Sequence, residues 1–266
     1  MTQTTISQSS SKQLHFQQLG QGDPIVLIHG LFGSLENLNM VAKQLSQHYR
    51  VISVDVRNHG NSFHQEGMAY TDLAQDVIHL LDYLSIDSCH FLGHSMGGKI
   101  AMQIALSSPE RVKKLVVADI APVAYPAHHL TIIKGLQAID LSKVKQRKDA
   151  DNQLAKYVDN VGVRQFLLRN ITMNDQGEFY FKCSLSNIEQ GYPQIMRAND
   201  APNGQTFIGD TLFIKGGDSD YILPKHQSII ASLFPNAKAK IIQGTGHWLH
   251  AEKTVAFNKV VADFLT

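Results

Sequence analysis

The sequence predicts an α/β protein in which a mostly parallel sheet is flanked by helices. Short runs rich in β-branched residues alternate with amphipathic stretches from residue 24 onward, which is the pattern of a parallel sheet covered by helices. The runs IVLIH, KLVVAD and TLFIK are apolar at almost every position, as expected for strands that are buried on both faces. One long stretch, residues 122–209, contains no such run and interrupts the alternation.

The expected elements follow one another as strand and helix along the chain. The strands are expected at residues 24–29, 50–54, 90–92, 114–118, 211–214 and 238–242. Apolar residues recur at helical spacing, i, i+3 and i+4, in residues 38–47, 71–84, 96–106, 224–233 and 254–265.

The interruption is predicted to be a helical cap insertion. Its sequence contains polar-rich helical stretches, among them residues 129–139 and 161–169. Residues 1–121 and 210–266 would then form one core, with residues 122–209 inserted after the carboxyl end of a strand. Ligands of open α/β sheets bind at that edge, so we expect the cap to shape substrate choice.

Composition and charge limit the classes of partner. Hydrophobic residues make up 43% of the chain and charged residues 18%, a balance typical of a folded globular protein. Lys plus Arg number 24 and Asp plus Glu number 23, a net charge of +1. This leaves no basic surplus for nucleic acid or an anionic membrane, so a small-molecule partner is expected.

The sequence gives no sign of a disulfide, a metal site, a signal peptide or a membrane span. Cys89 and Cys183 stand far apart, without a metal-spaced His or a second Cys nearby, so we expect buried thiols and no metal. The first dozen residues lack the apolar region of a signal peptide, and no apolar run approaches the roughly 18 residues of a membrane span. A cytoplasmic protein is expected, and its oligomeric state is left open.

The strongest chemical signal is the stretch GHSMGG, residues 93–98, between an expected strand and an expected helix. Such a sharp turn forces its central residue into strained backbone geometry, and it needs small residues two positions before and after. Gly93 and Gly97 meet that need around Ser95. The helix that follows adds a positive dipole, which favours an anionic intermediate. We therefore predict that Ser95 is a nucleophile.

A serine nucleophile needs a histidine base and a carboxylate, in the chain order Ser, acid, His. His247 follows the small-residue stretch GTG directly after the last expected strand, where its imidazole can hang over Ser95. His250 is the competing candidate. Asp119 and Asp220 both lie near strand carboxyl ends and both satisfy the order. Neighbouring strands are only about 4.8 Å apart, so spacing alone leaves the two aspartates as alternatives.

An oxyanion hole is expected from two backbone amides, one after the nucleophile and one in the loop after an early strand. These amides belong to Met96 and to Leu31 in the glycine-rich loop HGLFGS, residues 29–34. His29 would brace this loop.

Three further side chains are candidates for substrate binding. Phe32 and Trp248 flank the expected oxyanion loop and His247, where apolar side chains would cover an acyl chain. Arg57 belongs to VDVRNHG, after an early strand. It would either line the wall of the site or hold its loops.

These motifs together resemble a known superfamily. The stretches HGLFGSLENL, VDVRNHGNS, GHSMGGK, ADIAPVAY and GTGHWLHAEK are similar to the α/β-hydrolase superfamily, and within it to the bacterial YbfF-type esterases. The resemblance implies an α/β-hydrolase fold and a cofactor-free hydrolase of carboxylic esters or acyl thioesters. It also favours Asp119, because that branch keeps its acid in the strand-end motif written here as ADIAP. The wider superfamily more often uses the position filled here by Asp220.

The expected reaction is a two-step acyl transfer through an acyl-enzyme, and three alternatives stay open. An acyl-CoA thioesterase could use the basic cap residues Arg164, Arg169 and Arg197 to meet phosphates. An iminopeptidase would need paired acidic cap residues, and Glu178 and Glu189 form no obvious pair. A ligand-sensing protein could keep the pocket without useful turnover, because fold does not by itself determine function.

Overall fold

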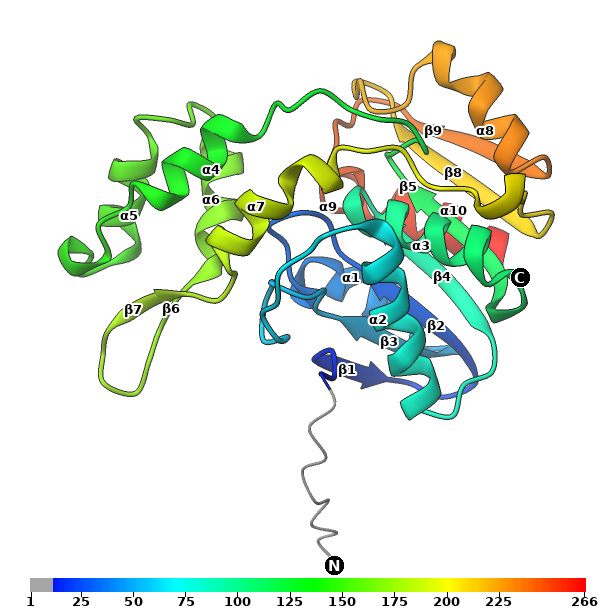
Figure 1. The fold of residues 1–266 in the computed structure, drawn as a ribbon, viewed down its shortest axis with the longest axis horizontal. Coiled ribbons are helices and arrows are strands. Elements are labelled where there is room, and N and C mark those ends of the chain that lie inside the picture. The colour runs from blue at the N-terminus through cyan, green and yellow to red at the C-terminus, as the bar shows by residue number, and fades with distance from the viewer. Residues whose placement is uncertain (1–11) are drawn as a thin grey trace, which may run out of the picture.

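The computed structural model describes residues 12–266, and its centre is a seven-stranded sheet (Figure 1). The strand order is β1-β3-β2-β4-β5-β8-β9, and every neighbouring pair is parallel except β1, which runs antiparallel to β3. The strands of this sheet are β1 Phe16–Leu19, β2 Asp23–Ile28, β3 Tyr49–Val54, β4 Cys89–His94, β5 Val112–Ala118, β8 Asp210–Gly216 and β9 Ala237–Ile242.

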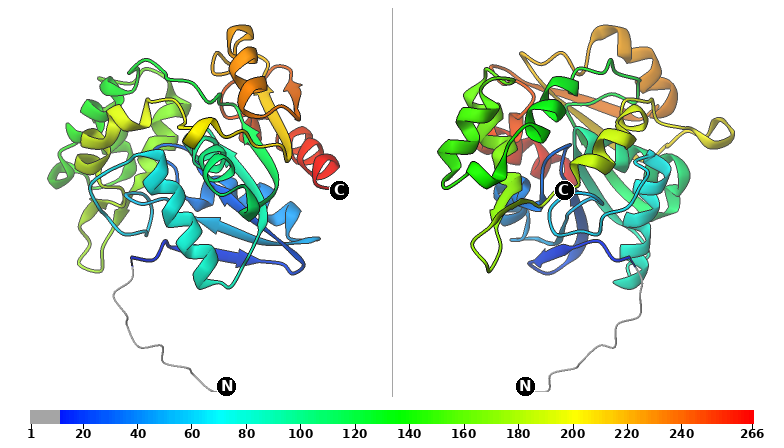
Figure 2. Two further views of the ribbon diagram at one scale, coloured as in Figure 1. Left: turned by 45° about the vertical axis from the view of Figure 1, so that its right-hand side comes forward. Right: turned by 60° about the vertical axis from the view of Figure 1, so that its left-hand side comes forward.

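Helices cover both faces of the sheet. One buried apolar cluster joins the sheet to α2 and α3, and a second joins the opposite face to α1 and α10. Figure 2 shows this layering from two further directions. The helices outside the inserted segment are α1 Asn39–Leu45, α2 Tyr70–Tyr83, α3 Met96–Ser107, α8 Gln227–Leu233, α9 Leu249–Glu252 and α10 Thr254–Leu265.

All six expected strands and all five expected core helices are present, with ends that differ by at most three residues from those predicted. The sequence missed β1. Its four residues, FQQL, lie at the sheet edge with three of them exposed, so no face of this strand carries a run of apolar side chains. Without buried alternation, a short edge strand leaves no periodic signal.

The inserted segment, residues 122–209, packs against one end of the sheet (Figure 1). The helices expected at 129–139 and 161–169 are present, although shorter. The sequence missed two helices and a hairpin of two three-residue strands. The elements of the segment are α4 Leu130–Gln137, α5 Arg147–Leu154, α6 Val161–Leu167, α7 Leu185–Ile195, β6 Ile171–Met173 and β7 Phe179–Phe181. Its buried side chains belong to the same apolar cluster as α2 and α3.

Three neighbouring strands determine where the chemistry lies. His94, Ala118 and Ile214 are in register at the carboxyl ends of β4, β5 and β8. The residues that follow these strands therefore meet at one edge of the sheet.

The structure also bears on the two expectations about cysteine thiols and membrane-spanning helices. Cys89 and Cys183 are both buried free thiols, as predicted. Among residues 12–266, no helix has the length and apolar character needed to cross a bilayer. Residues 1–11, on which the signal-peptide argument largely depends, lie outside the described part of the chain.

Candidate active site

Ser95 occupies the sharp turn between β4 and α3. Its backbone has φ 54° and ψ −121°, a conformation that non-glycine residues rarely adopt. A Cβ atom at Gly93 would collide with the carbonyl oxygen of Gly97, and a Cβ at Gly97 would collide with that of Ile28. The small residues around Ser95 are therefore a steric requirement of this turn.

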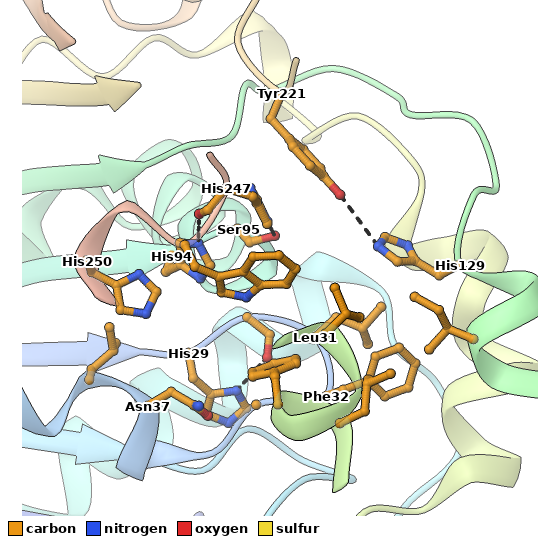
Figure 3. A pocket seen from close by; sticks show the side chains of 18 of the residues that line it. His29, Leu31, Phe32, Asn37, His94, Ser95, His129, Tyr221, His247 and His250 are labelled. Atoms are coloured by element: carbon orange, nitrogen blue, oxygen red, sulfur yellow. Dashed lines mark hydrogen bonds between the residues drawn. The ribbon is translucent and has the colours of Figure 1, made fainter. Parts of the chain in front are cut away.

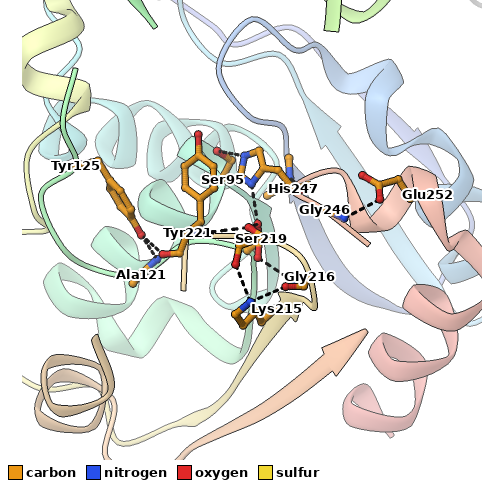
Figure 4. Close-up of polar contacts among 12 residues, drawn as sticks. Ser95, Ala121, Tyr125, Lys215, Gly216, Ser219, Tyr221, Gly246, His247 and Glu252 are labelled. Atoms are coloured by element: carbon orange, nitrogen blue, oxygen red, sulfur yellow. Dashed lines mark hydrogen bonds and ion pairs between the residues drawn. The ribbon is translucent and has the colours of Figure 1, made fainter. Parts of the chain in front are cut away.

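Ser95, His247 and Asp119 form a continuous hydrogen-bonded chain; Figure 4 shows its Ser95 and His247 members beside Gly216 and Ser219. The Nε2 atom of His247 lies 2.9 Å from Ser95 Oγ. Its Nδ1 atom lies 2.8 Å from Asp119 Oδ2. Since a carboxylate can only accept, Nδ1 carries the proton and Nε2 is free to take the proton of the serine hydroxyl.

Asp119 is completely buried and receives two further hydrogen bonds. The backbone N–H of Gly216 donates to Oδ1 at 3.0 Å, and the Ser219 hydroxyl donates to Oδ2. A buried carboxylate is tolerated only when donors satisfy it, and these donors also orient it toward the imidazole. No sequence pattern pointed to Ser219, because its role depends on where the loop after β8 folds back.

The alternative acid, Asp220, does not contact the imidazole. Its side chain is exposed, and among residues 12–266 it makes no hydrogen bond or ion pair. Asp119 follows β5 directly, whereas Asp220 stands four residues beyond the end of β8. Its chain neighbours Ser219 and Tyr221 contact Asp119 and His247, so what separates Asp220 from the imidazole is that its own side chain faces solvent.

Two backbone amides are free to face an oxyanion beside Ser95. Met96 is the first residue of α3, and the amide of such a residue has no acceptor within its own helix. Leu31 lies in the turn of residues 30–33, which is closed by a 2.9 Å bond from the Gly33 amide to the Gly30 carbonyl. Within the described residues, neither amide donates to another protein group.

Two buried neutral histidines hold the loop that contains Leu31. His29 donates from Nδ1 to the Gly30 carbonyl at 2.7 Å and accepts from the Val56 amide at Nε2. His59 accepts from the Phe32 amide at Nε2, at 3.1 Å. Burial lowers the pKa of His29, and it lowers the pKa of His59 to about 3. Both rings therefore remain neutral acceptors at physiological pH.

His94 holds the loop that contains His247. Its Nε2 donates to the His247 carbonyl at 2.8 Å, and burial holds its pKa well below the usual range. His250, the competing candidate for the base, packs on His94 with ring centroids 4.4 Å apart. It makes no hydrogen bond to Ser95 or Asp119, and burial lowers its pKa to about 4.

A cavity of about 320 Å³ opens at Ser95 (Figure 3). Figure 3 shows His94 and His250 to one side of Ser95 and His129 to the other. Most of the wall of this cavity is apolar. The apolar side chains that line it are Leu31, Phe32, Leu38, Ile132, Val163, Phe166, Leu167 and Trp248. Phe32 and Trp248, the two apolar candidates from the sequence, are therefore among the lining residues.

Arg57 lies outside this cavity, and the structure does not support a substrate contact for it. Its guanidinium makes a bidentate ion pair with Asp76, at 2.5 and 2.6 Å. It also donates to the carbonyls of Gly67 and Asp72, and it is 5% exposed. All three nitrogens of the guanidinium donate to protein groups, which fits the alternative expectation that Arg57 holds loops.

Tyr221 joins the inserted segment to His247. Its ring stacks on the imidazole, with centroids 3.9 Å apart and planes 18° apart. Its hydroxyl lies 3.0 Å from Nε2 of His128, which also lines the cavity. No sequence pattern distinguishes Tyr221, because the stack forms only when three distant segments meet.

Within residues 12–266, no group of His, Cys, Asp and Glu is arranged to hold a metal ion.

Lys99, one helical turn after Ser95, ties both ends of the inserted segment to α3. Its ammonium group donates to the carbonyls of Val123 and Arg197 and faces the rings of Tyr70 and Tyr125. It is 1% exposed, and in the described part of the chain it pairs with no carboxylate. Burial without a counter-charge lowers the pKa of Lys99 to about 7.

Lys99 is expected to make stability depend on pH. Between pH 7 and its ordinary pKa near 10.4, the unfolded chain holds the proton that the folded chain has lost, so the free energy of unfolding rises with pH by at most about 1.4 kcal/mol per unit. Urea unfolding at pH 7 and 9.5 should show this rise, and Lys99→Met should reduce it. Equal pH dependence in the two proteins would contradict the assignment.

The fold and the geometry at Ser95 define a hydrolase of the α/β class. The chain belongs to the alpha/beta hydrolase fold family, whose model matches residues 23–254. It is an esterase-type hydrolase, as its relatives indicate.

Esterase YbfF of Escherichia coli (strain K12) is 37% identical, over 94% of this chain and 95% of that protein. The sn-1-specific diacylglycerol lipase ABHD11 of Mus musculus is 41% identical, over 91% of this chain and 80% of that protein. A solved structure described as a marine microorganism esterase is 38% identical, with a TM-score of 0.91, and covers 96% of this chain and 100% of that one. The resemblance to the YbfF-type esterases is thereby confirmed.

Proposed function

We propose that this protein is a serine esterase that works through an acyl-enzyme, with Ser95 as nucleophile, His247 as base and Asp119 as acid. The observation that carries the proposal is the unbroken chain of contacts from Ser95 Oγ through both ring nitrogens of His247 to Asp119. A serine hydroxyl is a weak nucleophile unless such a base removes its proton.

The reaction follows from this geometry. His247 Nε2 takes the Ser95 proton as Oγ attacks the acyl carbonyl, and the amides of Leu31 and Met96 hold the resulting oxyanion. The imidazolium then gives its proton to the leaving oxygen, which releases the alcohol. Water, activated by the same imidazole, cleaves the acyl-enzyme and restores Ser95.

The cavity supports an ester with an apolar acyl chain. Among residues 12–266, its lining contains no carboxylate that could hold a substrate amino terminus. Glu178 and Glu189 bond instead to Asn174 and Gln137, away from Ser95. The iminopeptidase alternative therefore has no supporting contact. The apolar lining of the cavity fits a lipid ester, and the mouse relative is named as a diacylglycerol lipase.

We also propose that residues 122–209 act as a cap that forms one wall of the acyl cavity. Four of the apolar lining residues, 132, 163, 166 and 167, come from this segment. For the thioesterase alternative, Arg164 is paired with Asp151 and bonded to two carbonyls. Arg169 and Arg197 are exposed, and none of the three arginines lines the cavity. The cytoplasmic location remains a prediction.

Acyl-chain length should control turnover. Burying one methylene contributes about 0.8 kcal/mol, so for a series of nitrophenyl esters the ratio kcat/KM is expected to rise about fourfold with each methylene added to the acetyl group. The rise should end when the chain fills the cavity. Steady-state hydrolysis from acetyl to palmitoyl, with acyl-CoA thioesters of the same lengths alongside, measures this and gives the leaving-group preference.

The blank for this series is the Ser95→Ala variant. Turnover that is independent of chain length would argue against the cavity as the acyl site. Hydrolysis of thioesters but not of esters would favour the thioesterase, and no turnover above the blank on any substrate would overturn the esterase proposal.

A further inference from the structure

The turn that presents the Leu31 amide is strained. Phe32, the third residue of this four-residue turn, has a backbone φ of 59°. A turn with positive φ at this position normally carries glycine there, because a bulky side chain is crowded in that conformation. The turn therefore persists only where its surroundings hold it, and the direction of the Leu31 amide depends on that support.

Phe32 is held at both ends of its backbone. Its N–H donates to His59 Nε2 at 3.1 Å, from the loop after β3. Its carbonyl oxygen accepts a 2.7 Å hydrogen bond from the Asn170 side chain, which lies 138 residues further along the chain in the inserted segment. Phe32 and Asn170 are 3% and 4% exposed, so water cannot easily replace this bond.

Asn170 is itself firmly placed. The same amide nitrogen donates to the Leu167 carbonyl at 3.0 Å. The backbone carbonyl of Asn170 accepts a 2.8 Å hydrogen bond from the backbone amide of Lys182, the residue that follows β7. The residue thus lies at the junction between the end of α6 and the β6–β7 hairpin, and any movement of that junction is transmitted to Phe32.

We propose that Asn170 is a positioning residue, through which the inserted segment holds the oxyanion loop in its active conformation. The inference rests on the proposed function, because it assigns the Leu31 amide to the oxyanion. The segment would then contribute to the chemical step as well as to the acyl cavity. A substrate whose acyl chain is too short to reach the segment should still depend on Asn170.

A second asparagine provides a matched control. Asn187 also lies in the inserted segment, and its side chain donates to Asn58 Oδ1 at 3.0 Å. This bond joins the same two parts of the molecule, but it does not reach the turn of residues 30–33. Asn58 is also held by two bonds to the backbone of Gln65, so its position does not depend on Asn187.

The test compares Asn170→Ala with Asn187→Ala in the full chain. With 4-nitrophenyl acetate, Asn170→Ala is expected to lower kcat by about 10- to 100-fold, as expected when a catalytic group is misplaced. KM should stay within about twofold. A trifluoromethyl ketone, which Ser95 converts to a tetrahedral adduct with its oxyanion in the same place, should bind more weakly by the same factor. Asn187→Ala should change each quantity by less than about threefold.

Turnover is normalised to the burst of 4-nitrophenol, which counts the active sites, so a partly folded variant still gives a result. Asn170→Ser, which fills part of the space and keeps one donor, takes the place of Asn170→Ala if alanine prevents folding. An unchanged kcat, or a loss confined to the KM for long acyl esters, would overturn the inference. Activity retained by Ser95→Ala in the same assay would instead reject the proposed function.

Discussion

Replacing Ser95 by alanine is expected to lower kcat for ester hydrolysis by about a millionfold, the scale on which serine hydrolases lose turnover without their nucleophile. No other hydroxyl or thiol lies within hydrogen-bonding distance of His247 Nε2 among the described residues. Active-site titration and steady-state rates measure the loss. Retention of even one hundredth of the activity would mean that another group attacks the substrate.

The same position should reveal the cost of the strained turn. Ser95 adopts φ 54° and ψ −121°, which costs a non-glycine residue about 1 to 3 kcal/mol. Ser95→Gly relieves that strain but gives the unfolded chain more freedom, which offsets about 0.5 to 1 kcal/mol. We expect Ser95→Gly to be inactive and about 1 kcal/mol more stable than Ser95→Ala in urea unfolding. Equal stability of the two variants would argue against strain.

Replacing Asp119 by asparagine is expected to lower kcat/KM by about ten-thousandfold. The carboxylate accepts from the Gly216 amide on one oxygen, and from Ser219 and His247 on the other. Asparagine has a single oxygen, so its NH₂ group must face one of these donors. If it faces His247, the imidazole takes the tautomer with its proton on Nε2, which cannot accept the proton of Ser95.

Asp220→Asn is the matched control. It makes the same chemical change on an exposed side chain that contacts no imidazole, so its kcat/KM should stay within about twofold of the unmodified protein. Thermal unfolding of both variants separates lost chemistry from lost structure. A large loss in Asp220→Asn with a small one in Asp119→Asn would reverse the proposed assignment of the acid.

Periodicity predicted most of the core. Strands such as β5 and β8 are buried on both faces and are apolar over most of their length, so each carries its own signal. The hairpin β6–β7 has only three residues per strand, and only one of these six residues is fully buried. Its pairing depends on the helices around it, and for that reason the sequence did not predict it.

Some residues of the candidate site could be predicted from the sequence, and others could not. Ser95 and His247 stand in motifs whose local geometry is required by the neighbouring glycines, so the sequence alone singles them out. Ser219, Tyr221 and Asn170 have no such motif. Each acts through a partner about 26 to 138 residues away, and sequence spacing cannot show that two distant loops meet.

By itself, the sequence determined the α/β class, the chain order that makes a Ser, acid and His set possible, and the two residues of that set that stand in short motifs. These features depend on contacts between residues close together in the chain. Only the tertiary structure placed Asp119, and not Asp220, beside His247, showed that Arg57 does not line the cavity, and joined Asn170 to the turn of residues 30–33. In each of these cases the outcome depends on how a loop returns to the sheet, and that path is determined by packing across the whole molecule.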